Sequence, residues 1–394
     1  MSDNNRTIYL DNSATTKICP EALEVYNRVS TEHFGNPSSL HKEGFEAEAL
    51  LKESRATILQ TLGAKDSSII FTSSGTESNN LAITGRAFAK ERFIGKGKLI
   101  TTKGEHASVS EPMERLRKLG YKICYVDTKD GQLDFSQLEK ELDDSVVLVS
   151  IMLVNNETGA VYDVPRVAKA LAKYAKNAYL HVDATQGYMK IPFIKGVLGA
   201  DLITISSHKI EGPKGIGALI IDQRVIKEKG LSPIILGGGQ EDNFRSGTEN
   251  VPAICAFAKA AQVYSDNLKE RVQKITELRE YLIEKIISDV ELSEISITNP
   301  KMHSPHILNI TLPNIKSETM LHFLSTEGIF VSSGSACSSN TSHHVSGALT
   351  AYGRSEREAD CSIRISFSHR NKKEDADSLC EALKRGLKKL TRMK

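Results

Sequence analysis

Lys209 stands in a chemical setting that an ordinary surface lysine lacks. It ends the stretch "ISSHK", in which Ser206, Ser207 and His208 directly precede it, and the glycine-rich turn "IEGPKGIG" follows directly. Hydroxyl and imidazole groups suit the binding of a phosphate, and a lysine amine beside them suits a Schiff base with an aldehyde. We therefore interpret Lys209 as a reactive amine, although an arbitrary lysine is more often a solvated surface charge.

A second polar stretch, "SSGTES" at residues 73–78, follows a strand-like run and opens a helical one. Gly75 permits a tight turn there, and Thr76 adds a hydroxyl beside the free N–H groups of a helix N-terminus. Such a turn either binds a phosphate or is an ordinary helix cap. The turn alone leaves both interpretations open.

Two further strand ends carry groups that could meet a planar, charged ligand. Asp183 ends an apolar run in "HVDATQG", where a carboxylate needs a cation or hydrogen-bond donors, and Gln186 follows three residues later. His106 in "GEHAS" follows another strand, where an imidazole could stack on a ring or transfer a proton. The competing interpretations are a helix-capping aspartate and a structural histidine.

Together these residues match the needs of pyridoxal 5'-phosphate. They provide a phosphate site, a carboxylate for a protonated pyridine nitrogen, a Schiff-base lysine and a ring that could stack. All four stretches lie at the carboxyl ends of predicted strands, which is where open α/β sheets bind their ligands.

The elements that must position these residues alternate between short apolar runs and helical stretches from about residue 65 to 222. This alternation predicts an α/β fold with a mainly parallel sheet covered by helices on both faces. After Thr248, one long helical stretch at residues 251–286 leads to further strand-like runs and a last helix. We predict a large cofactor-binding domain at residues 16–262 and a smaller α+β domain made of residues 1–15 with 263–394.

Composition argues against several classes of function. The formal net charge is +2, so no strong field for nucleic acid or anionic lipid is expected. No apolar run of about 18 residues could span a membrane, and the N-terminus lacks the apolar core of a secretion signal. The six scattered cysteines form no C-x-x-C pair, which favours a reducing, cytoplasmic compartment.

One cysteine, Cys337, lies among serine, glycine and alanine in "VSSGSACSS". Buried cysteines usually lie among aliphatic side chains, and metal ligands usually occur in closely spaced groups. Cys337 fits neither pattern. Because serine and glycine offer little apolar surface, and Gly334 gives backbone freedom, we expect residues 335–345 to be poorly ordered and the thiol to be mobile.

The chain resembles the cysteine desulfurases of the NifS/IscS type, which are fold type I relatives of the class V aminotransferases. The resemblance covers nearly the whole chain and rests on motifs that occur in order: "YLDNSATT", "FTSSGTESNN", "EHASV", "VNNETG", "HVDATQ", "SSHKIEGPKGIGAL", "GGGQEDNFRSGTEN", "SSGSACSS" and "CSIRISFS". Among them, "RSGTEN" and "SSGSAC" indicate the first group of these enzymes.

The resemblance implies a role for each cofactor-binding residue. Lys209 holds pyridoxal phosphate, Asp183 pairs with the pyridine nitrogen, Gln186 bonds the phenolic oxygen, and His106 stacks on the ring. The phosphate contacts implied within the same chain are Gly75, Thr76, Ser206 and His208.

The resemblance also implies roles for residues outside these stretches. Asn156 lies near the ring and the substrate carboxylate, and Arg364 clamps that carboxylate. The strand pattern supports Arg364 independently, because Ile363 and Ile365 share one face and Arg364 points the other way. Thr248 is expected to reach the phosphate of the other subunit in an obligatory homodimer.

The implied reaction converts L-cysteine to L-alanine and leaves a persulfide on Cys337. An acceptor protein, such as an iron–sulfur scaffold, then collects the sulfur for iron–sulfur clusters or other sulfur-containing cofactors. The alternatives are a selenocysteine lyase-like or aminotransferase-like enzyme, and a non-catalytic assembly subunit. No metal ligand set is expected, since His343 and His344 are better explained as solvated loop residues.

Overall fold

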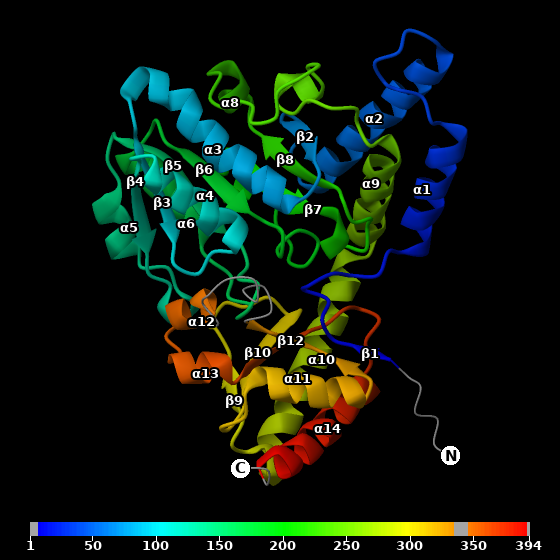
Figure 1. The fold of residues 1–394 in the computed structure, drawn as a ribbon, viewed down its shortest axis with the longest axis vertical. Coiled ribbons are helices and arrows are strands. Elements are labelled where there is room, and N and C mark those ends of the chain that lie inside the picture. The colour runs from blue at the N-terminus through cyan, green and yellow to red at the C-terminus, as the bar shows by residue number, and fades with distance from the viewer. Residues whose placement is uncertain (1–6, 335–345, 392–394) are drawn as a thin grey trace.

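A computed structural model describes residues 7–334 and 346–391, which form an upper and a lower body along the long axis of the molecule (Figure 1). The upper body contains a seven-stranded sheet, and the lower body contains a four-stranded sheet. A short parallel pair, β1 (Ile8–Tyr9) with β11 (Ile329–Phe330), ties the start of the described chain to the lower body.

The large sheet is mainly parallel, as the alternation of apolar runs and helices predicts. Its strand order is β2-β8-β7-β6-β5-β3-β4, and only β8 runs antiparallel to its neighbours. The strands are β2 (Ser68–Thr72), β3 (Lys98–Thr102), β4 (Lys122–Val126), β5 (Val146–Met152), β6 (Tyr179–Asp183), β7 (Leu202–Ser206) and β8 (Gly217–Ile221). The carboxyl ends of all the other strands therefore meet at one edge, where a ligand is expected.

Helices cover both faces of this sheet. Consecutive residues of a strand point to opposite sides, and on β2 Ile69 packs into one core while Ile70 packs into the other. The helices of the upper body are α1 (Pro20–Glu32), α2 (Lys42–Thr61), α3 (Gly75–Ile94), α4 (Ala107–Lys118), α5 (Phe135–Glu141), α6 (Val164–Tyr174), α7 (Lys195–Leu198), α8 (Gln223–Lys227) and α9 (Val251–Asp266). Helices α3 and α4 pack on the face of Ile70, and α6 and α9 pack on the opposite face.

The lower body is an antiparallel sheet packed against helices. Its strand order is β12-β13-β10-β9. The strands are β9 (Ser296–Thr298), β10 (Ile307–Thr311), β12 (Ser332–Ser333) and β13 (Ser362–Ser366), and the helices are α10 (Leu268–Ser288), α11 (Ser317–Thr326), α12 (Gly347–Tyr352), α13 (Glu356–Asp360) and α14 (Lys373–Thr391). One apolar core joins Ile8 and Leu10 to residues of α10, β10, β13 and α14. The domain bounds at residues 15/16 and 262/263 stay a prediction.

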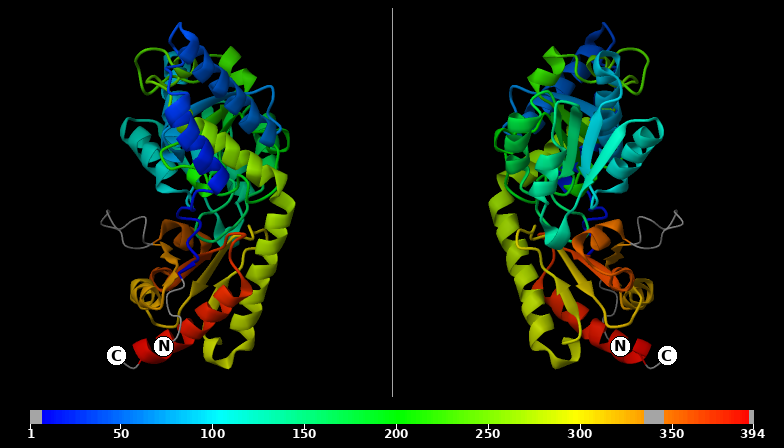
Figure 2. Two further views of the ribbon diagram at one scale, coloured as in Figure 1. Left: turned by 90° about the vertical axis from the view of Figure 1, so that its right-hand side faces the viewer. Right: turned by 90° about the vertical axis from the view of Figure 1, so that its left-hand side faces the viewer.

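The helical stretch predicted at residues 251–286 is divided into two helices. Asn267 separates α9 from α10 with φ −122° and ψ 14°. Its side chain bonds the carbonyl of Val263, and such local side-chain bonds are why asparagine favours helix ends. The two helices continue from the upper body down the side of the lower one (Figure 2).

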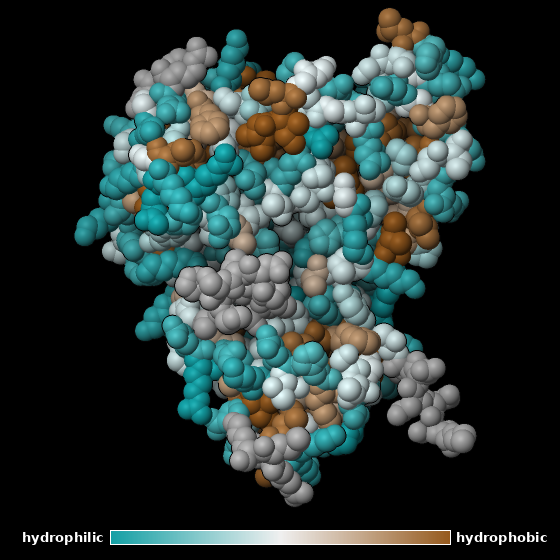
Figure 3. All heavy atoms as spheres, viewed as in Figure 1, coloured by the Kyte–Doolittle hydropathy of each residue, from teal (hydrophilic) through white to brown (hydrophobic). Residues whose placement is uncertain are grey.

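The face of the molecule in Figure 3 shows mostly hydrophilic side chains, with small separate hydrophobic patches. Within the part of the chain that the structure describes, no helix is both long enough and apolar enough to cross a membrane.

Candidate active site

A cavity of about 290 Å³ lies at the carboxyl ends of β2, β3, β5, β6 and β7, next to the lower body. Its lining includes these residues singled out from the sequence: Gly75, Thr76, His106, Asn156, Asp183, Gln186, Ser206, His208, Lys209 and Arg364. Side chains from distant parts of the sequence thus share one small space.

Lys209 enters this cavity from a short turn after β7. Ser207–Lys209 form a single 3₁₀ turn directly after the strand. Its Nζ donates hydrogen bonds to the carbonyl oxygens of Ser13, at 2.5 Å, and Ala14, at 2.9 Å. These two acceptors come from the N-terminal motif "YLDNSATT", for which the sequence predicted no role.

The N-terminus of α3 forms a cradle at one side of the cavity. Ser74 caps the helix, and a Cβ at Gly75 would lie 3.1 Å from Thr185 Oγ1 and 3.5 Å from Ser206 Cβ. The hydroxyls of Thr185 and Ser206 are buried, and neither has a hydrogen-bond partner among the described residues. Free hydroxyls beside a helix N-terminus fit a phosphate group.

The reason predicted for Gly75 is wrong. This residue is not among the glycines with positive φ, so no tight turn requires it. Glycine is needed because a side chain at this position would fill the space in front of Thr185 and Ser206.

Asp183 is a buried carboxylate at the end of β6, with 6% of its surface exposed. Its Oδ2 accepts a 2.8 Å hydrogen bond from Asn79 Nδ2, and its Oδ1 accepts one of 2.9 Å from the Thr185 N–H. The ion pairs found among the described residues do not include Asp183. A protonated pyridine nitrogen would supply the cation that this buried charge lacks.

Asn79 is a site residue that sequence reasoning missed. It lies four residues after Gly75 on α3, so helical spacing places both residues on the same face. The side chain also donates a 2.8 Å hydrogen bond to Ser108 Oγ, which lies 2.8 Å from His106 Nδ1. The spacing from Gly75 could have identified Asn79.

His106 is neutral near pH 7, with its proton on Nε2. It caps α4, and its Nδ1 accepts a hydrogen bond from the Ser108 N–H at 3.1 Å, so Nδ1 carries no proton. Burial lowers the pKa of His106, although the nearby Asp183 carboxylate acts in the opposite direction. The neutral ring presents an N–H donor on its other side.

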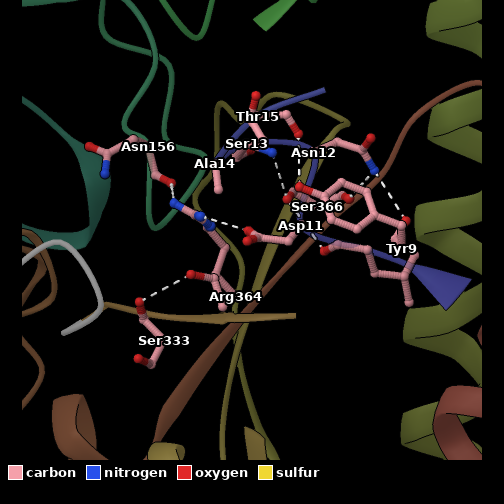
Figure 4. A network of polar contacts seen from close by, with 12 residues as sticks. Tyr9, Asp11, Asn12, Ser13, Ala14, Thr15, Asn156, Ser333, Arg364 and Ser366 are labelled. Carbon is pink, nitrogen blue, oxygen red and sulfur yellow. Dashed lines mark hydrogen bonds and ion pairs between the residues drawn. The ribbon is translucent and has the colours of Figure 1, made fainter. Parts of the chain in front are cut away.

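Arg364 reaches the cavity from β13, as the strand pattern predicts, while Ile363 and Ile365 are fully buried in the lower core (Figure 4). Its Nη2 pairs with Asp11 Oδ1 at 2.9 Å, and its Nη1 donates to the backbone carbonyl of Asn156, also at 2.9 Å. The remaining nitrogen, Nε, is buried and has no hydrogen-bond partner among the described residues.

The described residues on either side of segment 335–345 meet at Glu157. Ser346 Oγ donates a 2.5 Å hydrogen bond to Glu157 Oε2, and a Cβ at Gly334 would lie 2.3 Å from the same oxygen. Burial raises the pKa of Glu157 to about 7. A side chain at position 334 would therefore clash with Glu157, which is a reason for glycine besides the backbone freedom predicted from the sequence.

Cys337, His343 and His344, together with the expectation about the order of residues 335–345, lie outside the described residues. Among the residues that are described, no group of three or more histidine, cysteine or acidic side chains could hold a metal ion.

Thr248 does not line the cavity that holds Lys209. It is exposed in the single chain and borders a separate cavity of about 160 Å³ together with Ser73 and Gly215. A third cavity, of about 330 Å³, is bordered by Ser73 and Gly215 and also by His208 of the candidate site. Thr248 thus lies on the outer side of the cradle.

Comparisons with known proteins agree with this fold. The family model "Aminotransferase class-V" matches residues 8–379. The chain is 39% identical over 388 residues to a protein of Dictyoglomus turgidum named "Cysteine desulfurase IscS". The alignment covers 98% of this chain and 95% of the relative.

Two solved structures are also similar. A "NifS-like protein" superimposes with a TM-score of 0.88 at 34% identity, over 97% of this chain and 100% of the other. A structure described as "SspA in complex with cysteine" gives a TM-score of 0.78 at 32% identity, over 92% and 99% of the two chains. With a family model that spans most of its length and relatives this similar, the chain belongs to the aminotransferase class-V family.

Proposed function

We propose that this protein is a pyridoxal phosphate-dependent cysteine desulfurase, which converts L-cysteine to L-alanine and transfers the sulfur to Cys337. One observation carries the proposal: the amine of Lys209, the carboxylate of Asp183 and the guanidinium of Arg364 line one cavity. A relative named a cysteine desulfurase and a similar structure holding cysteine support the same reaction and substrate.

Different residues of the cavity would bind different parts of the cofactor. Lys209 would hold the aldehyde carbon and Asp183 the pyridine nitrogen. His106 would cover the ring and Gln186 would bond the phenolic oxygen. The phosphate would lie against the cradle formed by Gly75, Thr76, Ser206 and His208. When bound, pyridoxal phosphate supplies an electron sink for the carbanion formed at Cα of the amino acid.

Arg364 would bind the substrate carboxylate. Its Nε has no hydrogen-bond partner among the described residues, while the backbone of Asn156 and the carboxylate of Asp11 hold the other two nitrogens in place, each of which keeps a second N–H. A fixed, planar guanidinium orients a carboxylate better than a mobile ammonium would. The substrate would then enter with its side chain in a defined direction.

Lys209 is the residue we assign to proton transfer at the substrate, because its Nζ lies in the cavity and is held by two carbonyl oxygens. The Cys337 thiolate would attack the substrate sulfur. The new S–S bond forms as the Cβ–S bond breaks, and the electron pair of the broken bond stays with Cβ, which takes up a proton. The products are L-alanine and a persulfide on Cys337.

We also propose that the enzyme works as a homodimer and passes its sulfur to an acceptor protein such as an iron–sulfur scaffold. Thr248 would complete the phosphate site of the partner subunit, which fits its exposure on the outer side of the cradle. We propose a cytoplasmic location, from the scattered cysteines.

The test is to incubate the purified protein with pyridoxal phosphate and L-cysteine, and to measure alanine and protein-bound persulfide. We expect one alanine per sulfur released, no turnover and no bound-cofactor absorbance in Lys209→Ala, and bound cofactor without persulfide in Cys337→Ser. Lys227→Ala, a change at an exposed lysine on α8, is the matched control and should behave as wild type. Persulfide formation by Cys337→Ser at the wild-type rate would contradict the proposal.

A further inference from the structure

His306 joins the lower body to the cofactor-binding residue Gln186 of the upper body. It directly precedes β10, and only 1% of its surface is exposed. Its ring Nε2 lies 3.3 Å from Gln186 Oε1, and its Nδ1 lies 2.5 Å from Ser304 Oγ. Neither Ser304 nor His306 lines the cavity, whereas Gln186 does.

The orientation of the Gln186 amide follows from its other neighbour. Gln186 Nε2 lies 2.9 Å from the carbonyl oxygen of Ser13. A carbonyl oxygen only accepts hydrogen bonds, so the amide end facing Ser13 must be the NH₂ group. The oxygen of the Gln186 side chain therefore faces His306.

The same reasoning determines the tautomer of His306. The amide oxygen of Gln186 only accepts, so the proton must be on His306 Nε2, and Nδ1 accepts from the hydroxyl of Ser304. Burial lowers the pKa of His306 well below its ordinary value, and Lys190, Arg364 and Lys209 act in the same direction. The ring is therefore neutral, and one tautomer satisfies both of its contacts.

These contacts form a continuous chain that ends at the reactive lysine. Ser304 donates to His306, His306 donates to Gln186, and Gln186 donates to the carbonyl oxygen of Ser13. Lys209 Nζ donates to that same oxygen. Because an amide nitrogen carries two hydrogens, Gln186 keeps a second N–H for an acceptor in the cavity.

We propose that His306 is a positioning residue for the cofactor site. Its Nε2–H holds the Gln186 amide so that the cavity receives an N–H donor instead of a carbonyl oxygen, and it links the lower body to the carbonyl that anchors Lys209. If Gln186 turned over, its oxygen would face the oxygen of Ser13, and two acceptors would meet without a proton between them. This proposal rests on the proposed cofactor, because the donor acts on an acceptor atom of that group.

The first test is made on the cofactor-free protein and needs no activity. Histidine side chains are labelled with ¹⁵N, and the His306 signal is assigned by its loss in His306→Phe. We expect a neutral ring protonated at Nε2. A ring protonated at Nδ1, or a doubly protonated ring at pH 7, would overturn the proposal.

The second test measures the binding of pyridoxal 5'-phosphate by absorbance. His306→Phe keeps a planar ring but has no donor, so we expect its dissociation constant to rise about tenfold and the absorption band of the bound cofactor to shift. His306→Gln keeps a donor and should recover to within about threefold of wild type. His322→Phe, on the exposed side of α11, is the matched control and should not change binding.

Wild-type affinity and an unshifted band in His306→Phe would overturn the proposal. If that variant does not fold by circular dichroism, Ser304→Ala, which removes only the contact to Nδ1, is measured by NMR instead. If His306 stays protonated at Nε2 in Ser304→Ala, the result would support the proposal that the Gln186 oxygen keeps the proton there. Loss of this tautomer would overturn the proposal. A wild-type protein that binds pyridoxal phosphate but makes no alanine would contradict the proposed function and leave these readouts intact.

Discussion

At the scale of single residues, the candidate site contains buried polar atoms that have no hydrogen-bond partner among the described residues. Thr185 Oγ1, Ser206 Oγ and Arg364 Nε are buried, and none has a hydrogen-bond partner among the described residues. Each such group costs free energy in the folded protein unless a ligand satisfies it. Their residues all line one cavity, which is the expected result if a phosphate and a carboxylate bind there.

Arg364→Lys is expected to raise the KM for L-cysteine at least about tenfold, equivalent to about 1.4 kcal/mol. A lysine ammonium cannot hold Asp11, the Asn156 carbonyl and a substrate carboxylate in one plane, as the guanidinium can. Steady-state kinetics of alanine formation gives the measurement. The control is Arg357→Lys on the exposed side of α13, which should leave KM unchanged. An unaltered KM in Arg364→Lys would place the carboxylate elsewhere.

At the scale of elements, the site depends on where strands end and helices begin. Asp183 and Ser206 end adjacent parallel strands, β6 and β7, and α3 starts at Gly75 directly in front of them. The helix N-terminus contributes N–H groups and a partial positive charge. Every residue of β6 and β7 is buried, so the packing of these strands holds the spacing of the site.

Gly75→Ala is expected to weaken pyridoxal phosphate binding about tenfold while the fold persists. The added methyl group would lie 3.1 Å from Thr185 Oγ1, in the space in front of the free hydroxyls. Absorbance titration measures the affinity, and circular dichroism reports on the fold. Gly196→Ala on α7 is the control, because a Cβ there meets no atom within 4 Å. Equal affinities in both variants would mean that the phosphate does not use this cradle.

At the scale of the whole molecule, the site is assembled from both bodies and from the N-terminal segment. Arg364 and His306 come from the lower body, and Asp11 and Ser13 come from residues that precede α1. The cavity that holds Lys209 is therefore complete only when the two bodies are packed together. Stability and site geometry should change together in variants at this junction.

Buried titratable groups predict that stability is greatest near pH 6.5. Burial lowers the pKa of several histidines, and most strongly that of four: His181, His208, His306 and His369. They stay neutral in the folded protein but gain protons in the unfolded chain below pH about 6.5, so their contribution is lost as pH falls. Burial also raises the pKa of Glu157 to about 7 and that of Glu105 to about 8, and this opposite contribution is lost as pH rises through those values.

Between pH 5 and 6.5 these four histidines outnumber Glu105 and Glu157, the two carboxyls whose pKa is raised most, so the unfolded chain binds more protons. Each extra proton costs about 1.4 kcal/mol per pH unit. We expect the free energy of unfolding in urea to fall on both sides of pH 6.5, more steeply on the acid side. A free energy that is flat from pH 5 to 8 would contradict this balance.

Mixed dimers test whether Thr248 completes the partner's site. When Thr248→Ala and Lys209→Ala chains are combined, one site of the mixed dimer has both residues and the other has neither. Activity should therefore rise well above that of either parent. A mixture of Lys209→Ala and Cys337→Ser chains is the control, and its activity shows whether Cys337 acts within its own subunit. No recovery with Thr248→Ala would indicate self-contained subunits.

Much of the fold and of the site could be predicted from local sequence patterns. The alternation of apolar runs with helical stretches predicted a mainly parallel, doubly covered sheet, because burial on both faces requires apolar residues at consecutive strand positions. Strand ends located Asp183, Ser206 and Lys209, since ligands of such sheets bind at that edge. The period of two along β13 was enough to separate Arg364 from Ile363. Each of these signals acts within about ten residues of chain.

Only the tertiary structure showed the partners of those residues. Asp11 and Arg364 are 353 positions apart, and Gln186 and His306 are 120 apart, so no local periodicity relates them. The sequence explained Gly75 by a tight turn and Gly334 by backbone freedom. In the structure, both positions lie where another segment of the chain leaves little room for a side chain. Propensity and pattern determine how a segment folds and which side it buries. Which distant atom lies at hydrogen-bond distance is decided by how whole elements pack, and it is this packing that gives Arg364, Gln186 and Lys209 their orientations.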